Sequence, residues 1–371
     1  MLLVDAGDNF GGISEPEKRK AEVILRSMGA MGYDALGLGE IELNHGLDFL
    51  LDTAREAKVP LVCANLVSHR TGKPVVQPYV LLRRGKVKVA VLGLMDNVLE
   101  LISRSQGPDS LVVKDPFEVA HELIPALKKK ADLVVLLSHM GYAKSSKLAA
   151  EIPELDVLVT GHSPSVNMEA RREGNALGMM TGSRGQYVGY LLLRLGDKKS
   201  IETYESRLVP LDGRIRASAL VDGFVNDYNL REKKLLEERA RLQQEEALSH
   251  AGEDRYLGQE TCRRCHADTY ERIVQMGHAR AFTTLTKTNS DGLSECLPCH
   301  TTGFGEPTGF MSASVTPDRK DVQCESCHGK GTSHKRDGSY RLAGEKSCLV
   351  CHTDERSPDF SYKTYMRKIA H

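Results

Sequence analysis

Four copies of one short motif constrain this chain more than any other feature. Each copy has two cysteines three positions apart and a histidine directly after the second cysteine. The copies begin at Cys262, Cys296, Cys324 and Cys348, and they use eight of the nine cysteines in the 371-residue chain. A covalent c-type haem requires all three residues, because the thiols bond to the porphyrin and the histidine binds the iron. We therefore expect four covalent haems in the last third of the chain.

Zinc binding and a redox dithiol are the alternatives for such cysteine pairs. Zinc uses two pairs per ion, or one pair with two spaced histidines, and needs no histidine directly after each pair. A thioredoxin-like dithiol occurs once, beside a strand–helix pattern. Neither explains four identical copies, so the pattern favours haem. The predicted attachment residues are Cys262, Cys265, Cys296, Cys299, Cys324, Cys327, Cys348 and Cys351, and the predicted proximal iron ligands are His266, His300, His328 and His352.

The segment around these motifs resembles the tetrahaem cytochromes of the c-552/c-554 type over residues 257–371. The stretches that carry the resemblance are YLGQETCRRCH, MGHARAF, CLPCHTTGFGEPTGF, VQCESCHGKGTSH and CLVCH, in this order. It implies a small, mostly α-helical and irregular multihaem domain that exchanges electrons with redox partner proteins. It also implies histidine on both faces of most haems and a five-coordinate second haem, here the one on His300.

The histidines outside the motifs agree in number with this expectation. Residues 251–371 contain three of them, His278, His334 and His371, which are the predicted distal ligands. Three distal histidines would complete three haems and leave one open. The sequence leaves open which distal histidine binds which iron, and an exposed surface histidine is the alternative for each.

Residues 1–215 show a different pattern, in which apolar runs alternate with amphipathic stretches such as EPEKRKAEVILRSMG and FEVAHELIPALKKKA. Such alternation is typical of an α/β sheet with helices on both faces. We expect buried strands at Leu2–Val4, Ala35–Leu38, Leu61–Cys63, Val87–Leu94, Leu133–Leu137 and Val157–Val159.

Ligand-type side chains follow four of the predicted strands. They are Asp8, Glu40, His139 and His162. In open α/β sheets, ligands bind beyond the carboxyl ends of the strands, so these four side chains should converge there. Each histidine considered alone is more typical of a structural residue, whereas the four side chains together predict a divalent metal site.

This part of the chain resembles the calcineurin-like metallophosphoesterases, specifically the catalytic domain of the 5′-nucleotidases. The matching stretches are LLVDAGDNFGG, GYDALGLGEIELNHGLDFL, VPLVCANLV, VVLLSHMGY and DVLVTGHSPS, and the match spans about residues 1–213. The resemblance implies an α/β/β/α sandwich in which two divalent metals bind phosphate and activate a water molecule.

The sequence departs from this family at three places. The family's first strand, which bears Asp-x-His, is not in the sequence, and the family's Gly-Asn-His-Glu motif reads Gly39-Glu40-Ile41-Glu42. The final Gly-His-x-His motif ends at Pro164 instead of a ligand. By the family's roles one metal site is lost, and the other keeps the four residues named above.

The resemblance and its departures together imply a degenerate domain. It would bind one divalent ion, Mn, Zn or Fe, and a phosphorylated or other anionic small molecule, with little hydrolysis. The alternative is an active metal-dependent nucleotidase with a fused cytochrome partner.

We expect three segments: a metallophosphoesterase domain at 1–215, a linker helix at 216–250 and the cytochrome domain at 251–371. The later half of the helix is mostly charged, which favours a solvated linker over a dimerising coiled coil. Lysine plus arginine and aspartate plus glutamate both total 50, so net charge gives no basis for binding nucleic acid. No apolar run approaches the roughly 18 residues that would span a bilayer.

The predicted haems also bear on location. Bacteria attach c-type haem outside the cytoplasmic membrane, and no signal peptide is visible at Met1. We expect a periplasmic or other extracytoplasmic protein, with the export signal and the missing first strand upstream of this start.

Overall fold

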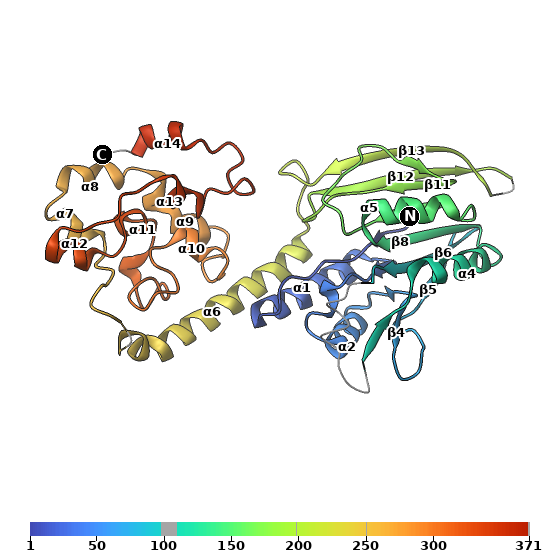
Figure 1. The fold of residues 1–371 in the computed structure, drawn as a ribbon, viewed down its shortest axis with the longest axis horizontal. Helices are drawn as coiled ribbons and strands as arrows, with labels where there is room; N and C mark the ends of the chain where they lie inside the picture. The colour runs from blue at the N-terminus through green and yellow to red at the C-terminus, as the bar shows by residue number, and fades with distance from the viewer. Residues whose placement is uncertain (98–109, 198, 250, 370–371) are drawn as a thin grey trace. The chain divides into compact units, whose positions relative to one another are not determined.

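The computed structural model describes residues 1–97, 110–197, 199–249 and 251–369. The chain forms two compact units that divide between Phe224 and Val225 (Figure 1). This division lies inside helix α6 (Ala219–Ser249), the segment expected to be a separate linker. No helix in the described ranges is both long and apolar enough to cross a membrane.

A six-stranded sheet forms the centre of the first unit, in the order β10-β11-β9-β8-β6-β5. Strands β11, β9, β8 and β6 run parallel, and the edge strands β10 and β5 are antiparallel to their neighbours. The bounds are β5 (Tyr79–Arg84), β6 (Val87–Met95), β8 (Leu133–His139), β9 (Val157–Thr160), β10 (Arg171–Glu173) and β11 (Ala176–Met179).

Three smaller groups of strands complete the unit. A parallel sheet contains β1 (Val4–Asp5), β2 (Ala35–Gly37) and β3 (Leu61–Val62), and β4 (Leu66–Ser68) pairs with β7 (Leu111–Val113). An antiparallel hairpin joins β12 (Tyr187–Leu195) to β13 (Ile201–Pro210). All six strands expected from the sequence are present, with ends shifted by one or two residues.

The apolar runs become strands that are covered on both faces. All seven residues of β8 are buried, as in parallel sheets that lie between other layers. Helices α4 (Pro116–Lys128) and α5 (Gly141–Glu151) contribute Ile124 and Leu148 to a core with Leu136. Leu191 and Leu193 of the hairpin pack against a second core that contains Val91 and Val135.

Helices α1 (Glu15–Met31) and α2 (Leu47–Ala57) form a third core with the small sheet, through Leu25, Leu50 and Leu36.

Capping side chains mark where helices begin. The Asp115 carboxylate accepts the backbone N–H groups of Phe117 and Glu118 at 2.8 and 3.0 Å, which caps α4. The predicted layered α/β fold is confirmed.

The second unit consists mainly of short helices and irregular segments, as predicted. Its buried apolar core is small and contains Phe282, Leu285, Leu297 and Phe310. The helices are α7 (Gln259–Arg263), α8 (Ala267–Ile273), α9 (Ala281–Thr286), α10 (Leu297–His300), α11 (Cys324–His328), α12 (Gly331–Asp337), α13 (Glu345–Leu349) and α14 (Tyr362–Ile369).

Helix α6 contributes to this unit from Val225 onward. Leu236 packs against the small apolar core, and the Lys233 ammonium lies 2.7 Å from the buried Asp291 carboxylate. Glu237 accepts a hydrogen bond of 2.8 Å from the Ser312 hydroxyl. One face of the charged helix is therefore anchored, and the sequence did not indicate this because only Leu236 is apolar among these contacts.

Candidate metal and haem sites

Four side chains converge beyond the carboxyl ends of β1, β2, β8 and β9. They are Asp8, Glu40, His139 and His162, and one ligand atom of each lies within 4.8 Å of all the others. His139 Nε2 lies 3.1 Å from Asp8 Oδ2 and 3.2 Å from His162 Nδ1. His162 Nδ1 lies 3.4 Å from Glu40 Oε1. The structure thus brings together the four residues that the strand ends suggested.

The chemistry of this cluster fits a divalent cation. His139 Nδ1 donates to the Ala6 carbonyl at 2.7 Å, which leaves Nε2 facing the cluster as the nitrogen that could bind a cation in place of a proton. Glu40 Oε2 is buried and has no hydrogen-bond partner, although His139 Nε2 lies 3.4 Å away outside hydrogen-bond geometry. A buried carboxylate oxygen without a partner is costly, and a cation would satisfy it. Mixed oxygen and nitrogen donors suit Mn, Zn or Fe.

Electrostatics points the same way. Burial lowers the pKa of His139, but its close ion-pair contacts with the Asp8 and Glu40 carboxylates outweigh burial and raise that pKa to about 10. The contact with His139 holds the pKa of Glu40 below its usual value. The Asp8 and Glu40 carboxylates therefore favour the protonated, positively charged form of His139. A divalent cation at the centre of the cluster would take the place of this proton.

The backbone around the cluster is under constraint. Asp8 and His162 have φ values of 64° and 53°, in the left-handed region that residues other than glycine rarely adopt. An added Cβ at Gly39 would overlap the Asp8 carboxylate and the His139 ring. Such local strain is typical of ligand sites, where surrounding contacts maintain it.

Glu42 supports the cluster, and the sequence reasoning gave it no role. Its fully buried carboxylate accepts the backbone N–H groups of Asp8, Asn9 and Gly39 at 2.9, 2.6 and 2.8 Å. Burial raises the pKa of Glu42 to about 7, although these hydrogen bonds oppose the shift. Glu42 therefore joins the Asp8 loop to the Glu40 loop. The available signal was an acidic residue two positions after a candidate ligand.

Two replaced family positions offer no ligand or proton. Ile41 begins a short 3₁₀ turn (Ile41–Leu43), and its side chain packs against an apolar core. Pro164 is exposed and has no donor atom for a metal. Within the described residues, the structure brings together one cluster of this kind.

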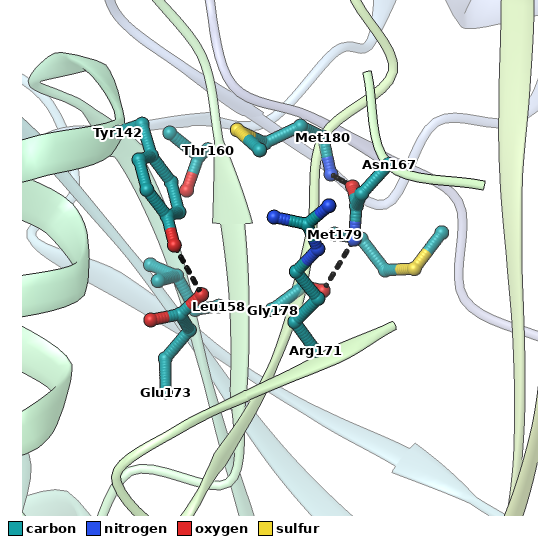
Figure 2. A pocket seen from close by; sticks show the side chains of 9 residues that line it. All are labelled: Tyr142, Leu158, Thr160, Asn167, Arg171, Glu173, Gly178, Met179 and Met180. Carbon is teal, nitrogen blue, oxygen red and sulfur yellow. Dashed lines mark hydrogen bonds between the residues drawn. The ribbon is translucent and has the colours of Figure 1, made fainter. Parts of the chain in front are cut away.

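A small cavity of about 10 Å³ lies next to the end of β9, where Thr160 is one of its walls (Figure 2). This is room for about one water molecule. The Tyr142 hydroxyl donates to Glu173 at 3.0 Å, and the Asn167 amide donates to the Gly178 carbonyl at 3.0 Å. These hydrogen bonds tie α5 to β10 and the loop after β9 to β11, and none of the four cluster residues lines the cavity.

Two pairs of histidine rings in the second unit have the spacing of axial ligands on one iron. The ring centres of His266 and His334 are 6.1 Å apart, and those of His278 and His352 are also 6.1 Å apart. Two imidazoles that bind one metal from opposite sides through bonds of roughly 2 Å have ring centres roughly 6 Å apart. The residues therefore fit haem with histidine on both faces.

Hydrogen bonds fix the orientation of three predicted proximal histidines. His300 Nδ1 lies 2.7 Å from the Ala281 carbonyl, and His328 Nδ1 lies 3.2 Å from the Arg341 carbonyl. His352 Nδ1 lies 3.0 Å from the Ser357 hydroxyl. An imidazole held through Nδ1 presents Nε2 to a metal, as iron ligation requires.

Predicted attachment cysteines of different motifs lie near one another. The Cys262 thiol is close to the Cys324 thiol, and the Cys299 thiol is close to the Cys351 thiol. The first and third Cys-x-x-Cys-His motifs are therefore neighbours, as are the second and fourth. Of the predicted distal ligands, His371 lies outside the described residues. Within the described residues, no histidine ring faces His300.

Comparison with known proteins agrees with this geometry for the first unit. The chain is 32% identical over 177 residues to a 5′-nucleotidase of Vibrio cholerae, a match that covers 44% of this chain and 32% of that protein. The chain thus spans about a third of that relative's length. Among solved structures, sulfate thiohydrolase SoxB of Thermus thermophilus has a TM-score of 0.55 at 21% identity, covering 62% of this chain and 42% of its own.

A 5′-nucleotidase precursor of Thermus thermophilus has a TM-score of 0.54 at 24% identity and covers 62% of this chain and 49% of its own. The first unit therefore has the calcineurin-like metallophosphoesterase fold and is related in sequence to 5′-nucleotidases. In the second unit, the family "Cytochrome c554 and c-prime" matches residues 261–329, which include the first three haem motifs. The chain joins a metallophosphoesterase-type domain to a cytochrome c554-type segment.

Proposed function

We propose that the second unit transfers electrons through four covalent haems, in the periplasm or another extracytoplasmic location. The observation that carries this proposal is the pair of 6.1 Å ring separations, His266 with His334 and His278 with His352. An iron that holds histidine on both faces has no open position for substrate, so such haems exchange electrons with redox partner proteins.

The haem attached at Cys296 and Cys299 is proposed to be five-coordinate. His300 is its proposed proximal ligand, held by the Ala281 carbonyl. Within the described residues no histidine ring faces His300, and it is the resemblance to c-554-type cytochromes, in which the second haem is five-coordinate, that selects His300 as the open position. When bound, this haem would supply a site for a small ligand. We expect the electron paramagnetic resonance spectrum of the oxidised protein to show one high-spin iron, whereas four low-spin irons would contradict the assignment.

The haem number is tested by a pyridine haemochrome assay on protein matured in the periplasm. We expect four haems per chain, and mixing with a reduced one-electron carrier should reduce all four. Two haems per chain, or zinc in place of iron, would overturn the proposal for this unit.

For the first unit we propose that one divalent ion and an anionic small molecule bind at the cluster, with weak or no phosphoester hydrolysis. Rapid hydrolysis in two-metal sites relies on a pair of ions about 4 Å apart that stabilise the attacking and leaving oxygens. Ile41 provides no proton for the leaving group, a contribution worth about 10²–10⁴-fold. The alternative function is an active phosphoesterase. The four retained ligands and the relationship to 5′-nucleotidases are the observations in its favour.

The two alternatives differ in an assay of the manganese-loaded protein. We expect at most one non-haem metal per chain and little turnover of nucleotides or generic phosphoesters. Robust turnover that Asp8→Ala abolishes would establish the phosphoesterase instead.

A further inference from the structure

One buried carboxylate in the third haem motif contacts three separate backbone segments. Glu325 lies between Cys324 and Cys327, and 3% of its surface is exposed. Its Oε1 accepts the N–H groups of Leu257 and Gly331 at 2.8 and 2.7 Å, and its Oε2 accepts the Gly258 N–H at 2.8 Å. Every oxygen of this carboxylate is therefore committed to backbone donors.

These donors belong to the two elements that carry the axial ligands of one iron. Leu257 and Gly258 directly precede α7, which contains Cys262 and leads to His266. Gly331 is the first residue of α12, which contains His334. Glu325 thus links the proximal side of this haem position to its distal side, where the two imidazole centres are 6.1 Å apart.

Gln323 reinforces the same link. It is 5% exposed, and its Oε1 accepts the Gln259 N–H at 3.0 Å. Its amide also donates to the carbonyls of Asp318 and Lys320 at 2.8 and 2.7 Å. Gln323 and Glu325 together satisfy three successive N–H groups at the start of α7, which otherwise lack helical partners.

The charge of Glu325 lies next to two haem positions. Glu325 directly follows Cys324, and its carboxylate accepts the Gly258 N–H at 2.8 Å, four residues before Cys262. A negative charge in a buried environment is weakly screened and favours the more positive, oxidised state of a nearby iron.

We propose that Glu325 is a positioning residue that sets the distance between the axial ligands of the haem at Cys262 and lowers the reduction potentials of the haems at Cys262 and Cys324. This inference rests on the proposed haem attachment and goes beyond it. It assigns two roles to one side chain: it fixes the spacing of the axial histidines of one haem, and it lowers the reduction potentials of two haems.

The test uses the complete, haem-loaded chain. Glu325→Gln removes the charge and keeps the size of the side chain. We expect four haems, and spectroelectrochemical titration should show an upward shift of two of the four midpoint potentials. Glu345→Gln is the matched control, because Glu345 is exposed and precedes the fourth motif. We expect it to leave the same two potentials unchanged.

A second variant separates position from charge and remains informative if Glu325→Gln matures poorly. Glu325→Asp keeps the charge and shortens the side chain by one methylene, so its carboxylate can no longer accept from the Leu257, Gly258 and Gly331 N–H groups together. We expect the low-spin resonance of one haem to change while the others stay the same.

Unchanged potentials in Glu325→Gln, or equal shifts of all four, would overturn the charge assignment. An unchanged spectrum in Glu325→Asp would overturn the positioning role. If the wild-type chain itself carries fewer than four haems, the proposed function fails instead of this inference.

Discussion

At the scale of single residues, the cluster of Asp8, Glu40, His139 and His162 combines a strained backbone with two carboxylates held close together. Asp8 and His162 adopt left-handed backbone conformations that cost about 1–3 kcal/mol each in side chains other than glycine. Glu42 offsets part of this cost by accepting the Asp8 N–H from a fully buried position. The arrangement is organised in advance for a cation, because the carboxylates are held together by protein contacts.

His139→Ala should remove the non-haem metal. A change in a residue that merely orients a ligand costs about 10–100-fold in affinity, so loss of a ligand should cost at least about 100-fold. Metal analysis of protein loaded with manganese and then desalted measures this. His121→Ala is the control, because His121 is exposed and pairs with Glu151 at 3.1 Å, outside the cluster. Equal metal content in both variants would contradict the site.

Cys63 should be the single free thiol of the mature protein, and it should be unreactive. Burial raises the pKa of the Cys63 thiol to about 11, and the residue is fully buried. The thiolate is the reactive form, so alkylation at pH 8 should be very slow in the native state. We expect no labelled thiol in the folded protein and one per chain after denaturation. Additional thiols after denaturation would indicate cysteines without attached haem.

At the scale of elements, the strand ends were predictable and the packing of helix α6 was not. Buried parallel strands such as β8 contain a continuous apolar run, here Leu133–Leu137, so the position of the strand and of the ligand at its end follow from the sequence. The hairpin β12–β13 has alternating exposure and gave a weaker signal. Helix α6 is anchored by polar contacts such as that of Lys233 with Asp291. Such a contact cannot be predicted without knowing where the distant partner lies in the folded chain.

The contacts of α6 predict unequal effects for two leucines on the same helix. Leu236→Asp places a charge against the small core of the second unit and should lower the free energy of unfolding by about 2 kcal/mol. Leu242→Asp is the matched control, because Leu242 is 78% exposed and should have little effect. Thermal unfolding followed by haem absorbance compares them. Equal melting temperatures would show that the helix is a free linker.

At the scale of the whole molecule, the two units differ in the source of their stability. Among the described residues, the first contains three large apolar cores, whereas the apolar core cluster of the second has four buried members. The cysteine motifs indicated candidate haem positions in the sequence, but the proximity of His266 to His334 depends on how loops fold back and could not be inferred from spacing.

Without haem, the second unit should be unfolded while the first stays folded. Small domains that depend on a bound cofactor couple its binding to folding. Limited proteolysis of protein produced in the cytoplasm, where haem is not attached, should leave a resistant fragment that ends near Phe224. The haem-loaded chain is the control and should resist cleavage in both units. Equal resistance without haem would contradict the prediction.

The link through Glu325 has a consequence for the order of events during synthesis and export. Leu257 and Glu325 are 68 positions apart, so in a chain exported from its N-terminus, as proposed, the start of α7 would emerge well before its hydrogen-bond acceptor. The first Cys-x-x-Cys-His motif would then be reachable as open chain by the enzymes that attach haem. Its final shape would form only after Gly331 and His334 had emerged. Attachment of the first haem would thus precede the closure of the segment that surrounds it.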